Sequence, residues 1–312
     1  MFSGQEIIAS LRLLVVVAKA DGEVHPDEEK ALVDALQGLD LPGGYTAKAL
    51  LEEEVALEEI LAELKSEEVR RQAFRAAYLM AHVDSKYTAA EQRLIERLRE
   101  QWLIPQEEIN QLDKGLSLAD TTLMFSISAP VAAQREDEAN RKIKQYLVLT
   151  TLTAAIPVPL VGDLMVAPLQ MGMVYELGTI YGHHLDKASI KAMLSTFGIG
   201  KGLRIAISSL AKLVPGWGSI VGAVGAFSTT YALAQVAKKY FESSRRLSLD
   251  SLKPLFAQKE EEGKKQFELQ KDSIANPEVA EQIKRIGEKV STGELKPEQL
   301  QRHISELAGK IG

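Results

Sequence analysis

The stretch AKADGEVHPDEEKAL at residues 18–32 recurs as AHVDSKYTAAEQRLI at residues 81–95. At one constant separation, the alignment pairs Asp21 with Asp84 and Glu28 with Glu91. Each copy contains the end of an apolar helical stretch, an Asp in a turn, and a Glu in the first turns of the next helix. Two such helix–turn–helix units predict a small all-α bundle with approximate twofold symmetry.

Helical spacing of apolar residues continues along the chain, and no stretch alternates as a strand would. We expect one helix from Thr46 to about Lys65 and another over residues 67–83. A third opens at Thr88, because Thr88 and Glu91 have the spacing of a capping box. Three prolines are expected to break the apolar sequence between residues 145 and 175 into short helices, namely Pro157, Pro159 and Pro168. The predicted fold class is all-α.

Charge divides the chain into segments. Residues 1–120 hold 24 acidic and 13 basic side chains, whereas residues 121–250 hold 8 and 13. We expect an acidic helical domain at 1–118, a connector at 119–140, a hydrophobic Gly/Ala-rich helical domain at 141–246, and a charged helical tail at 247–312. A break in the tail is expected at Asn276-Pro277. The acidic first domain disfavours nucleic acid as a partner and suits cations or basic proteins.

The repeated acidic residues are candidate metal ligands. If the two turns meet across the pseudo-axis, one carboxylate cluster results from Asp21, Glu28, Asp84 and Glu91. Hard cations take six to eight oxygen ligands, so calcium or manganese fits such a cluster, and nearby His25 and His82 extend the choice to zinc. Turn stabilisation by the Asp side chains and helix capping by the Glu side chains explain the same pattern without a metal.

The sequence offers no evident catalytic machinery. A chain with no cysteine has no thiol nucleophile and no Cys-ligated metal. The glycine-rich residues 198–202 fail the phosphate-loop pattern, because Ser195 stands where its first Gly belongs and Gly202 where Ser or Thr belongs. No HExxH motif and no nucleophile elbow are present. We therefore expect no nucleotide cofactor and no enzymatic activity.

Residues 213–237 carry no charge. At about 1.5 Å per residue, a helix of this length would cross a hydrocarbon core of about 30 Å. Gly218, Gly222 and Gly225 favour a close helix crossing in this stretch. Basic residues flank the domain and place both of its ends on the cytoplasmic side, namely Arg141, Lys142, Lys144, Lys238, Lys239, Arg245 and Arg246. An inserted hairpin, a peripheral domain and a soluble bundle remain open alternatives.

The first domain resembles the TerB-like family, which includes tellurite-resistance protein B and the N-terminal domain of the co-chaperone DjlA. The resemblance rests on AKADGEVHPDEE and on the second copy with Asp84 and Glu91. It implies an all-helical domain that binds metal through these acidic residues and acts in stress response or tellurite resistance.

Residues 141–245 resemble the YcjF-like family. The resemblance rests on Ile156-Pro157-Val158-Pro159, Gly162-Asp163 and Leu213-Val214-Pro215-Gly216-Trp217-Gly218. It implies a helical, membrane-associated module that often occurs beside GTPases. The expected function is that of a non-enzymatic sensor or adaptor on the cytoplasmic side of a membrane, bound to lipid and to a cation or protein partner. The alternative is a soluble scaffold or regulator of a separately encoded GTPase.

Overall fold

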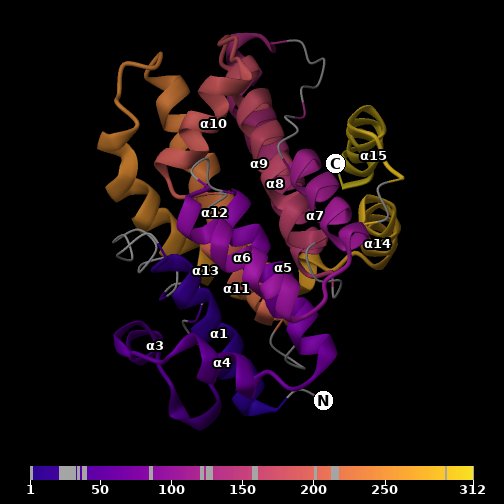
Figure 1. Cartoon of the computed structure of the whole chain (residues 1–312). Coiled ribbons are helices and arrows are strands. Elements are labelled where there is room, and N and C mark those ends of the chain that lie inside the picture. The colour runs from indigo at the N-terminus through magenta and orange to yellow at the C-terminus, as the bar shows by residue number, and fades with distance from the viewer. Residues whose placement is uncertain are drawn as a thin grey trace. The chain divides into compact units, whose positions relative to one another are not determined.

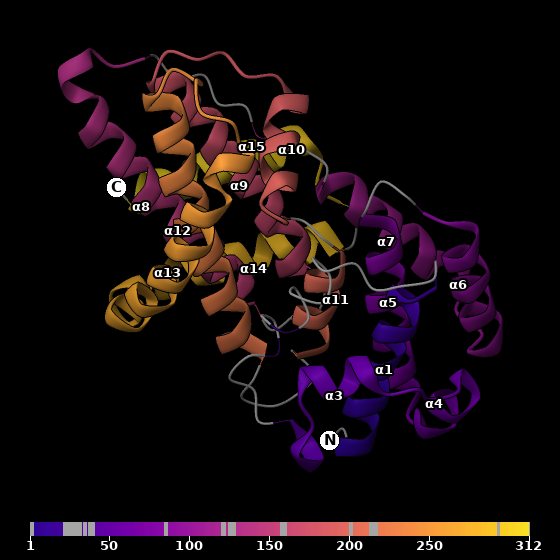
Figure 2. The same cartoon turned by 90° about the vertical axis from the view of Figure 1, so that its left-hand side faces the viewer.

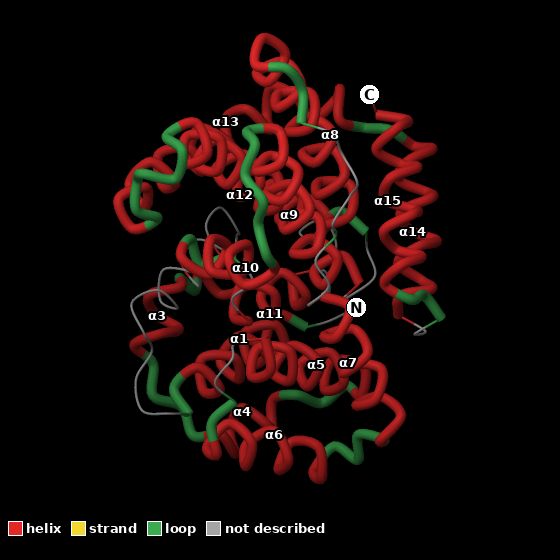
Figure 3. The backbone as a smooth tube through the Cα atoms, turned by 90° about the horizontal axis from the view of Figure 1, so that it is seen from above, coloured by secondary structure: helices red, strands yellow, loops and turns green. Residues whose placement is uncertain are grey.

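The computed structural model describes residues 3–20, 33, 36, 41–83, 87–119, 123, 129–156, 161–199, 202–211, 218–291 and 294–311. Over this part of the chain the backbone consists of helices and connecting loops, without a strand (Figure 3). The expected all-α fold is therefore confirmed. Of the predicted metal ligands, Asp21, Glu28 and Asp84 lie outside the described residues.

The described helices fall into two compact units. The first contains α1 (Gly4–Ala18), η1 (Pro42–Gly44), α3 (Ala47–Glu52), α4 (Leu57–Glu63), α5 (Glu67–Val83), α6 (Ala89–Gln101), most of α7 (Gln106–Ala119) and α11 (Gly202–Ala211). The second contains η2 (Ala132–Gln134), α8 (Arg135–Ala154), α9 (Val161–Ile180), α10 (Lys187–Thr196), α12 (Gly218–Glu242) from Gly222 onward, η3 (Asp250–Leu252), α13 (Lys253–Ile274), α14 (Pro277–Ser291) and α15 (Pro297–Ile311). Figure 1 labels these helices.

The first unit is built around α1, which packs against α3, α4, α5 and α11. The buried carboxylate of Glu6 joins the starts of two helices. It accepts hydrogen bonds from the backbone N–H of Ser3, which caps α1, at 3.1 Å, and from that of Ser66, just before α5, at 2.9 Å. Burial would raise the pKa of Glu6, but these hydrogen bonds lower it below its usual value. Glu6 thus stays ionised where it satisfies otherwise orphaned backbone donors.

One expected helix and one expected capping box are confirmed, whereas a third expected helix is divided into two. The helix over residues 67–83 and the capping box of Thr88 and Glu91 are both present. Thr46 caps a helix as expected, but that helix ends at Glu52, and a second one begins only at Leu57. The interruption occurs because Glu53 leaves the helix and binds Arg12, a residue distant in sequence.

The second unit encloses α9, whose apolar residues are spread around its whole circumference. A helix without a polar face needs protein or lipid on every side. Here α8, α10 and α14 pack against it, and Gln170 donates a hydrogen bond to Thr230 Oγ1 of α12 at 3.1 Å. The expected break at Pro168 is wrong, because α9 continues through this proline. Tertiary packing on several faces outweighs the local cost of the proline ring.

One close helix approach in the second unit joins α12 and α13. A Cβ at Gly263 would lie 2.9 Å from Ser228 Cα, so only glycine fits there. By contrast, a Cβ at Gly225 would meet nothing within 4 Å, and the expected close crossing at Gly225 is wrong. Phe227 also packs edge-on against Phe267 of α13, with centroids 5.6 Å apart. The close approach therefore uses a glycine from the charged C-terminal segment.

The helices of this C-terminal segment cover the apolar ones. Asn276 accepts a hydrogen bond from the Val279 N–H, so the chain breaks and restarts at Asn276-Pro277 as expected. Figures 1 and 2 show α14 and α15 side by side, and α14 contacts α8 and α9 while α15 contacts α8. The apolar faces of α14 and α15 are buried, as shown by Val279, Ile283, Ile286, Val290, Leu300, Ile304 and Leu307. None of the described helices combines the length and hydropathy needed to cross a membrane.

A buried ion pair joins α8 and α9 in this unit. Lys142 Nζ of α8 lies 2.7 Å from Glu176 Oε2 of α9, and the Glu176 side chain is only 4% exposed. Burial raises the pKa of Glu176, and the neighbouring ammonium group offsets part of that rise. The charge of Glu176 is therefore tolerated because Lys142 is present.

We expect Lys142→Met to destabilise the protein by about 3–5 kcal/mol at pH 7, because it leaves a buried carboxylate without a partner. Since the folded pKa of Glu176 is raised, the folded variant binds this proton more tightly than the unfolded chain does. Its free energy of unfolding should then fall as the pH rises above about 4.3, the usual Glu pKa. Urea unfolding at pH 4 and pH 7 measures both effects.

Arg141→Met is the matched control, because Arg141 pairs with Glu138 on the exposed side of the same helix. An exposed pair contributes about 0–1 kcal/mol. Lys142→Met/Glu176→Leu should recover most of the lost stability. Equal losses for Lys142→Met and Arg141→Met would contradict the role given to the buried pair.

Candidate functional site

Glu91 is the one predicted metal ligand that the structure describes. Its Oε2 accepts a hydrogen bond from the Thr88 N–H at 2.7 Å, and its own N–H donates to Thr88 Oγ1 at 3.2 Å. The capping role is therefore confirmed and occupies one of the two carboxylate oxygens. Within the described residues, no group of three or more Asp, Glu or His side chains is arranged to hold a metal.

His82 lies at the end of α5, just before the second acidic turn of the sequence. Its Nδ1 is 2.8 Å from the carbonyl oxygen of Tyr78, and its ring lies between those of Tyr78 and Tyr87 at centroid distances of 3.9 and 4.1 Å. A carbonyl oxygen can only accept, so Nδ1 carries the hydrogen, which leaves Nε2 as the ring nitrogen that could bind a metal. This is the arrangement in which histidine commonly binds metals.

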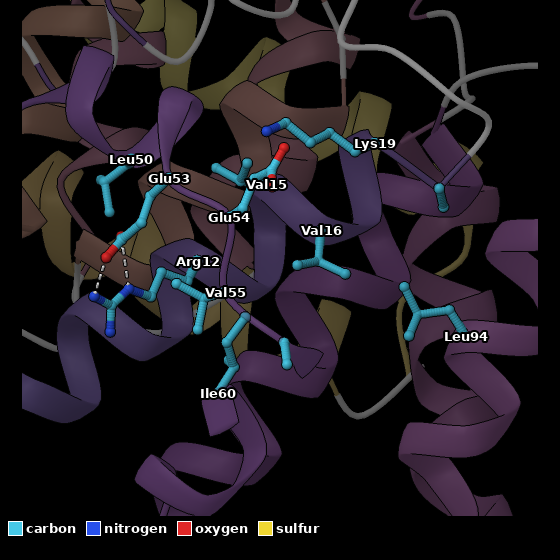
Figure 4. Close-up of a pocket in the computed structure, with 12 residues that line it drawn as sticks. Arg12, Val15, Val16, Lys19, Leu50, Glu53, Glu54, Val55, Ile60 and Leu94 are labelled. Carbon is cyan, nitrogen blue, oxygen red and sulfur yellow. Dashed lines mark hydrogen bonds and ion pairs between the residues drawn. The ribbon is translucent and has the colours of Figure 1, made fainter. Parts of the chain in front are cut away.

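A pocket of about 530 Å³ lies within the first unit, and Figure 4 shows the side chains around it. Its walls come from α1, from α3, from the loop between α3 and α4, from α4 and from α6. They are mainly aliphatic, with Val15, Val16, Leu50, Val55, Ile60 and Leu94. Charged residues also line it, namely Arg12, Lys19, Glu53 and Glu54. The described lining includes no serine, threonine or histidine, so these residues support binding and offer no nucleophile or general base of those types.

Arg12 organises this pocket. Its Nε and Nη2 bind the two carboxylate oxygens of Glu53 at 2.9 and 2.6 Å, and its Nη1 lies 3.0 Å from Glu63 Oε2. Nη2 also donates to the hydroxyl of Tyr45 at 2.8 Å. Lys19 Nζ donates to the carbonyl oxygen of Leu51 at 2.6 Å. Both cations are engaged by the protein itself, so the pocket suits an aliphatic side chain better than an anion.

The second unit presents three exposed cations at the C-terminal end of α12, and we call Lys239, Arg245 and Arg246 the α12 basic end. Ser244 and Arg245 both have positive φ, 54° and 62°, which non-glycine residues adopt rarely. The Arg245 guanidinium lies 5.9 Å from the centre of the Tyr240 ring.

The other basic residues that flank the predicted hydrophobic domain are partly engaged within the protein. Lys238 binds Glu136, Arg141 binds Glu138 and Lys142 binds Glu176. An acidic neighbour of the α12 basic end is Asp186, whose pKa is lowered mainly by hydrogen bonds from Ser189 and to a lesser degree by Arg245. Within the α12 basic end, Arg245 and Arg246 lie at a turn with positive φ, whereas Lys239 lies in the last turn of α12.

Residues 6–114 match the protein family described as tellurite resistance protein TerB. These residues form a TerB domain. It contains Glu91, the stacked His82 and the whole aliphatic pocket, and the match ends before the second unit begins. The chain is also similar to "Magnetosome membrane protein 22" of Magnetospirillum gryphiswaldense. The two are 29% identical over 147 residues, which cover 43% of this chain and 75% of that protein. No solved structure matches the chain significantly.

Sequence reasoning missed the aliphatic pocket and the part that α11 plays in the TerB unit. One signal for the pocket was present, because Arg12 is a single cation within the apolar residues of α1. A mostly buried arginine needs carboxylate partners. Its partners could not be identified from spacing, since Glu53 and Glu63 are far from Arg12 in sequence.

Proposed function

We propose that the chain is a non-enzymatic adaptor whose TerB domain binds a divalent cation or a protein partner while the second unit docks on the cytoplasmic face of a membrane. The α12 basic end is the observation that carries the membrane half of the proposal. The similar protein named as a magnetosome membrane protein and the resemblance of residues 141–245 to the YcjF-like family support it. The aliphatic pocket, whose described lining offers binding surfaces, supports the adaptor role of the TerB domain.

Docking is proposed as peripheral because protein already covers the apolar helices. Residues of α9 and α12 such as Met173, Val174, Leu233 and Val236 are fully enclosed. An anionic membrane surface attracts each nearby Lys or Arg by about 1 kcal/mol, so the three exposed cations at the end of α12 supply useful affinity without insertion. Tyr240 beside Arg245 has the amphipathic ring that suits the headgroup layer.

We expect the full chain to bind vesicles that contain phosphatidylglycerol more tightly than vesicles of phosphatidylcholine alone, with affinity falling as salt rises. Lys239→Gln/Arg245→Gln/Arg246→Gln should weaken binding to the anionic vesicles by at least about tenfold. Vesicle flotation over a range of lipid concentrations measures this loss.

The matched control removes the same charge elsewhere. In Lys48→Gln/Arg97→Gln/Lys271→Gln, each cation lost is exposed and paired with a carboxylate. This variant should keep nearly the wild-type affinity. Equal losses in the two triple variants would show attraction by net charge alone and refute the docking site. A wild-type chain that binds no vesicle at low salt would favour the alternative, a scaffold that works with a GTPase.

The cation half of the proposal rests on Asp21, Glu28, Asp84 and Glu91. Glu91 and His82 fit a metal in their chemistry, because each keeps an atom with a lone pair after its structural bonds are made. In titration calorimetry of the full chain, we expect weak binding of Ca²⁺, Mn²⁺ or Zn²⁺ that disappears in Asp21→Asn/Asp84→Asn. Asp113→Asn is the control, because Asp113 already accepts the Tyr78 hydroxyl. Silence with all three cations would refute the cation site.

A further inference from the structure

The helix α11 belongs to the first unit, although the chain on both sides of it belongs to the second. Residues 202–211 group with the TerB domain, whereas α10 and α12 from Gly222 onward do not. The TerB family match ends at residue 114 and so does not include α11. The TerB domain is therefore completed by a helix that the rest of the chain contributes.

The side chains of α11 that the structure describes are buried, as in a core helix. The helix contacts α5 and α1, and Figure 2 shows it beside them. Ala206, Ile207 and Leu210 of α11 are all buried. The helix α5 has Ala73, Ala76 and Ala77 among its fully buried residues. Since both α1 and α5 contact α11, these two helices together form a surface that accommodates a helix.

We infer that the α1–α5 surface of the TerB domain is a receptor for an amphipathic helix, which α11 occupies in cis. A partner helix with small and aliphatic residues at the spacing of Ala206, Ile207 and Leu210 would compete for this surface. The inference gives the proposed adaptor a named binding surface and rests on the adaptor role to that extent.

The length of α11 favours exchange. A helix of ten residues is too short to be stable in water by itself, so α11 forms because the receptor surface holds it. Since α11 is tethered, its local concentration is high, and an outside helix would bind only weakly until α11 is displaced.

The test uses the full chain and a fluorescein-labelled peptide of residues 200–213. Ile207→Asp places a charge at a position that is 1% exposed and should displace α11 from its surface. We expect the Ile207→Asp chain to bind the peptide at least tenfold more tightly than the wild-type chain does, by fluorescence anisotropy. Leu103→Asp is the control, because Leu103 lies in the same domain and is 85% exposed. It should bind as weakly as the wild type.

A second peptide that carries Ile207→Asp should bind to none of the three chains. A cooperatively folded Ile207→Asp chain that fails to distinguish the two peptides would overturn the inference. Vesicle binding of that same chain should remain at the wild-type level, since the α12 basic end is unchanged. Loss of peptide binding with vesicle binding intact would therefore refute the helix receptor alone and leave the docking proposal standing.

Native-state hydrogen exchange of the wild-type chain tests the inference without a variant. A separable helix exchanges through a local opening, so the amides of α11 should show a lower free energy of opening than those of α5 and little dependence on denaturant. Exchange of α11 and α5 at the same free energy and with the same denaturant dependence would show that α11 is an inseparable core helix. That result would overturn the inference, even if the Ile207→Asp chain did not fold.

Discussion

Enclosure of helices that have no polar face is the constraint on which the rest of this structure depends. Such a helix gains little from water on any side, so it is stable only where other apolar surfaces surround it. In the second unit α9 meets this condition through α8, α10 and α14 and through the Gln170–Thr230 bond to α12. In the first unit α1 meets it through α3, α4, α5 and α11. In each unit the other helices are arranged around one such centre.

This enclosure decides how the second unit can meet a membrane. The charged helices α13, α14 and α15 pack against α8, α9 and α12 and place ion pairs such as Lys271–Glu268 outward. The apolar area that would favour insertion is thereby buried within the protein. The carboxylate of Glu176, which is left inside, pairs with the ammonium group of Lys142. Under the proposed docking, the bilayer would meet the α12 basic end, where exposed positive charge lies beside a turn with positive φ.

The sequence was sufficient to predict features that depend on interactions between residues close in the chain. The span of α5, the capping box of Thr88 and Glu91 and the break at Asn276 follow from periodicity and capping, and all three are confirmed. The interruption at Glu53 was not predictable, because its cause is an arginine in another helix. Pro168 is tolerated within α9 for reasons of packing that no spacing reveals. Spacing also cannot reveal which unit receives α11, because its partners α1 and α5 are distant in sequence. Of the candidate metal site, the role of Glu91 in its cap was predictable, and the grouping of all four residues stays a prediction.

The most direct test of this enclosure uses the absence of cysteine from the chain. Met173→Cys places a single thiol on α9 where the side chain has no exposed surface, and Leu103→Cys places one where it is 85% exposed. Each variant is treated with a water-soluble and with a lipid-soluble thiol reagent, both free and bound to anionic vesicles. The enclosed-helix account predicts that the thiol at position 173 stays unreactive to both reagents in both states, while the thiol at position 103 reacts with the water-soluble one. Rapid labelling of position 173 by the lipid-soluble reagent on vesicles would contradict it, because α9 would then face lipid.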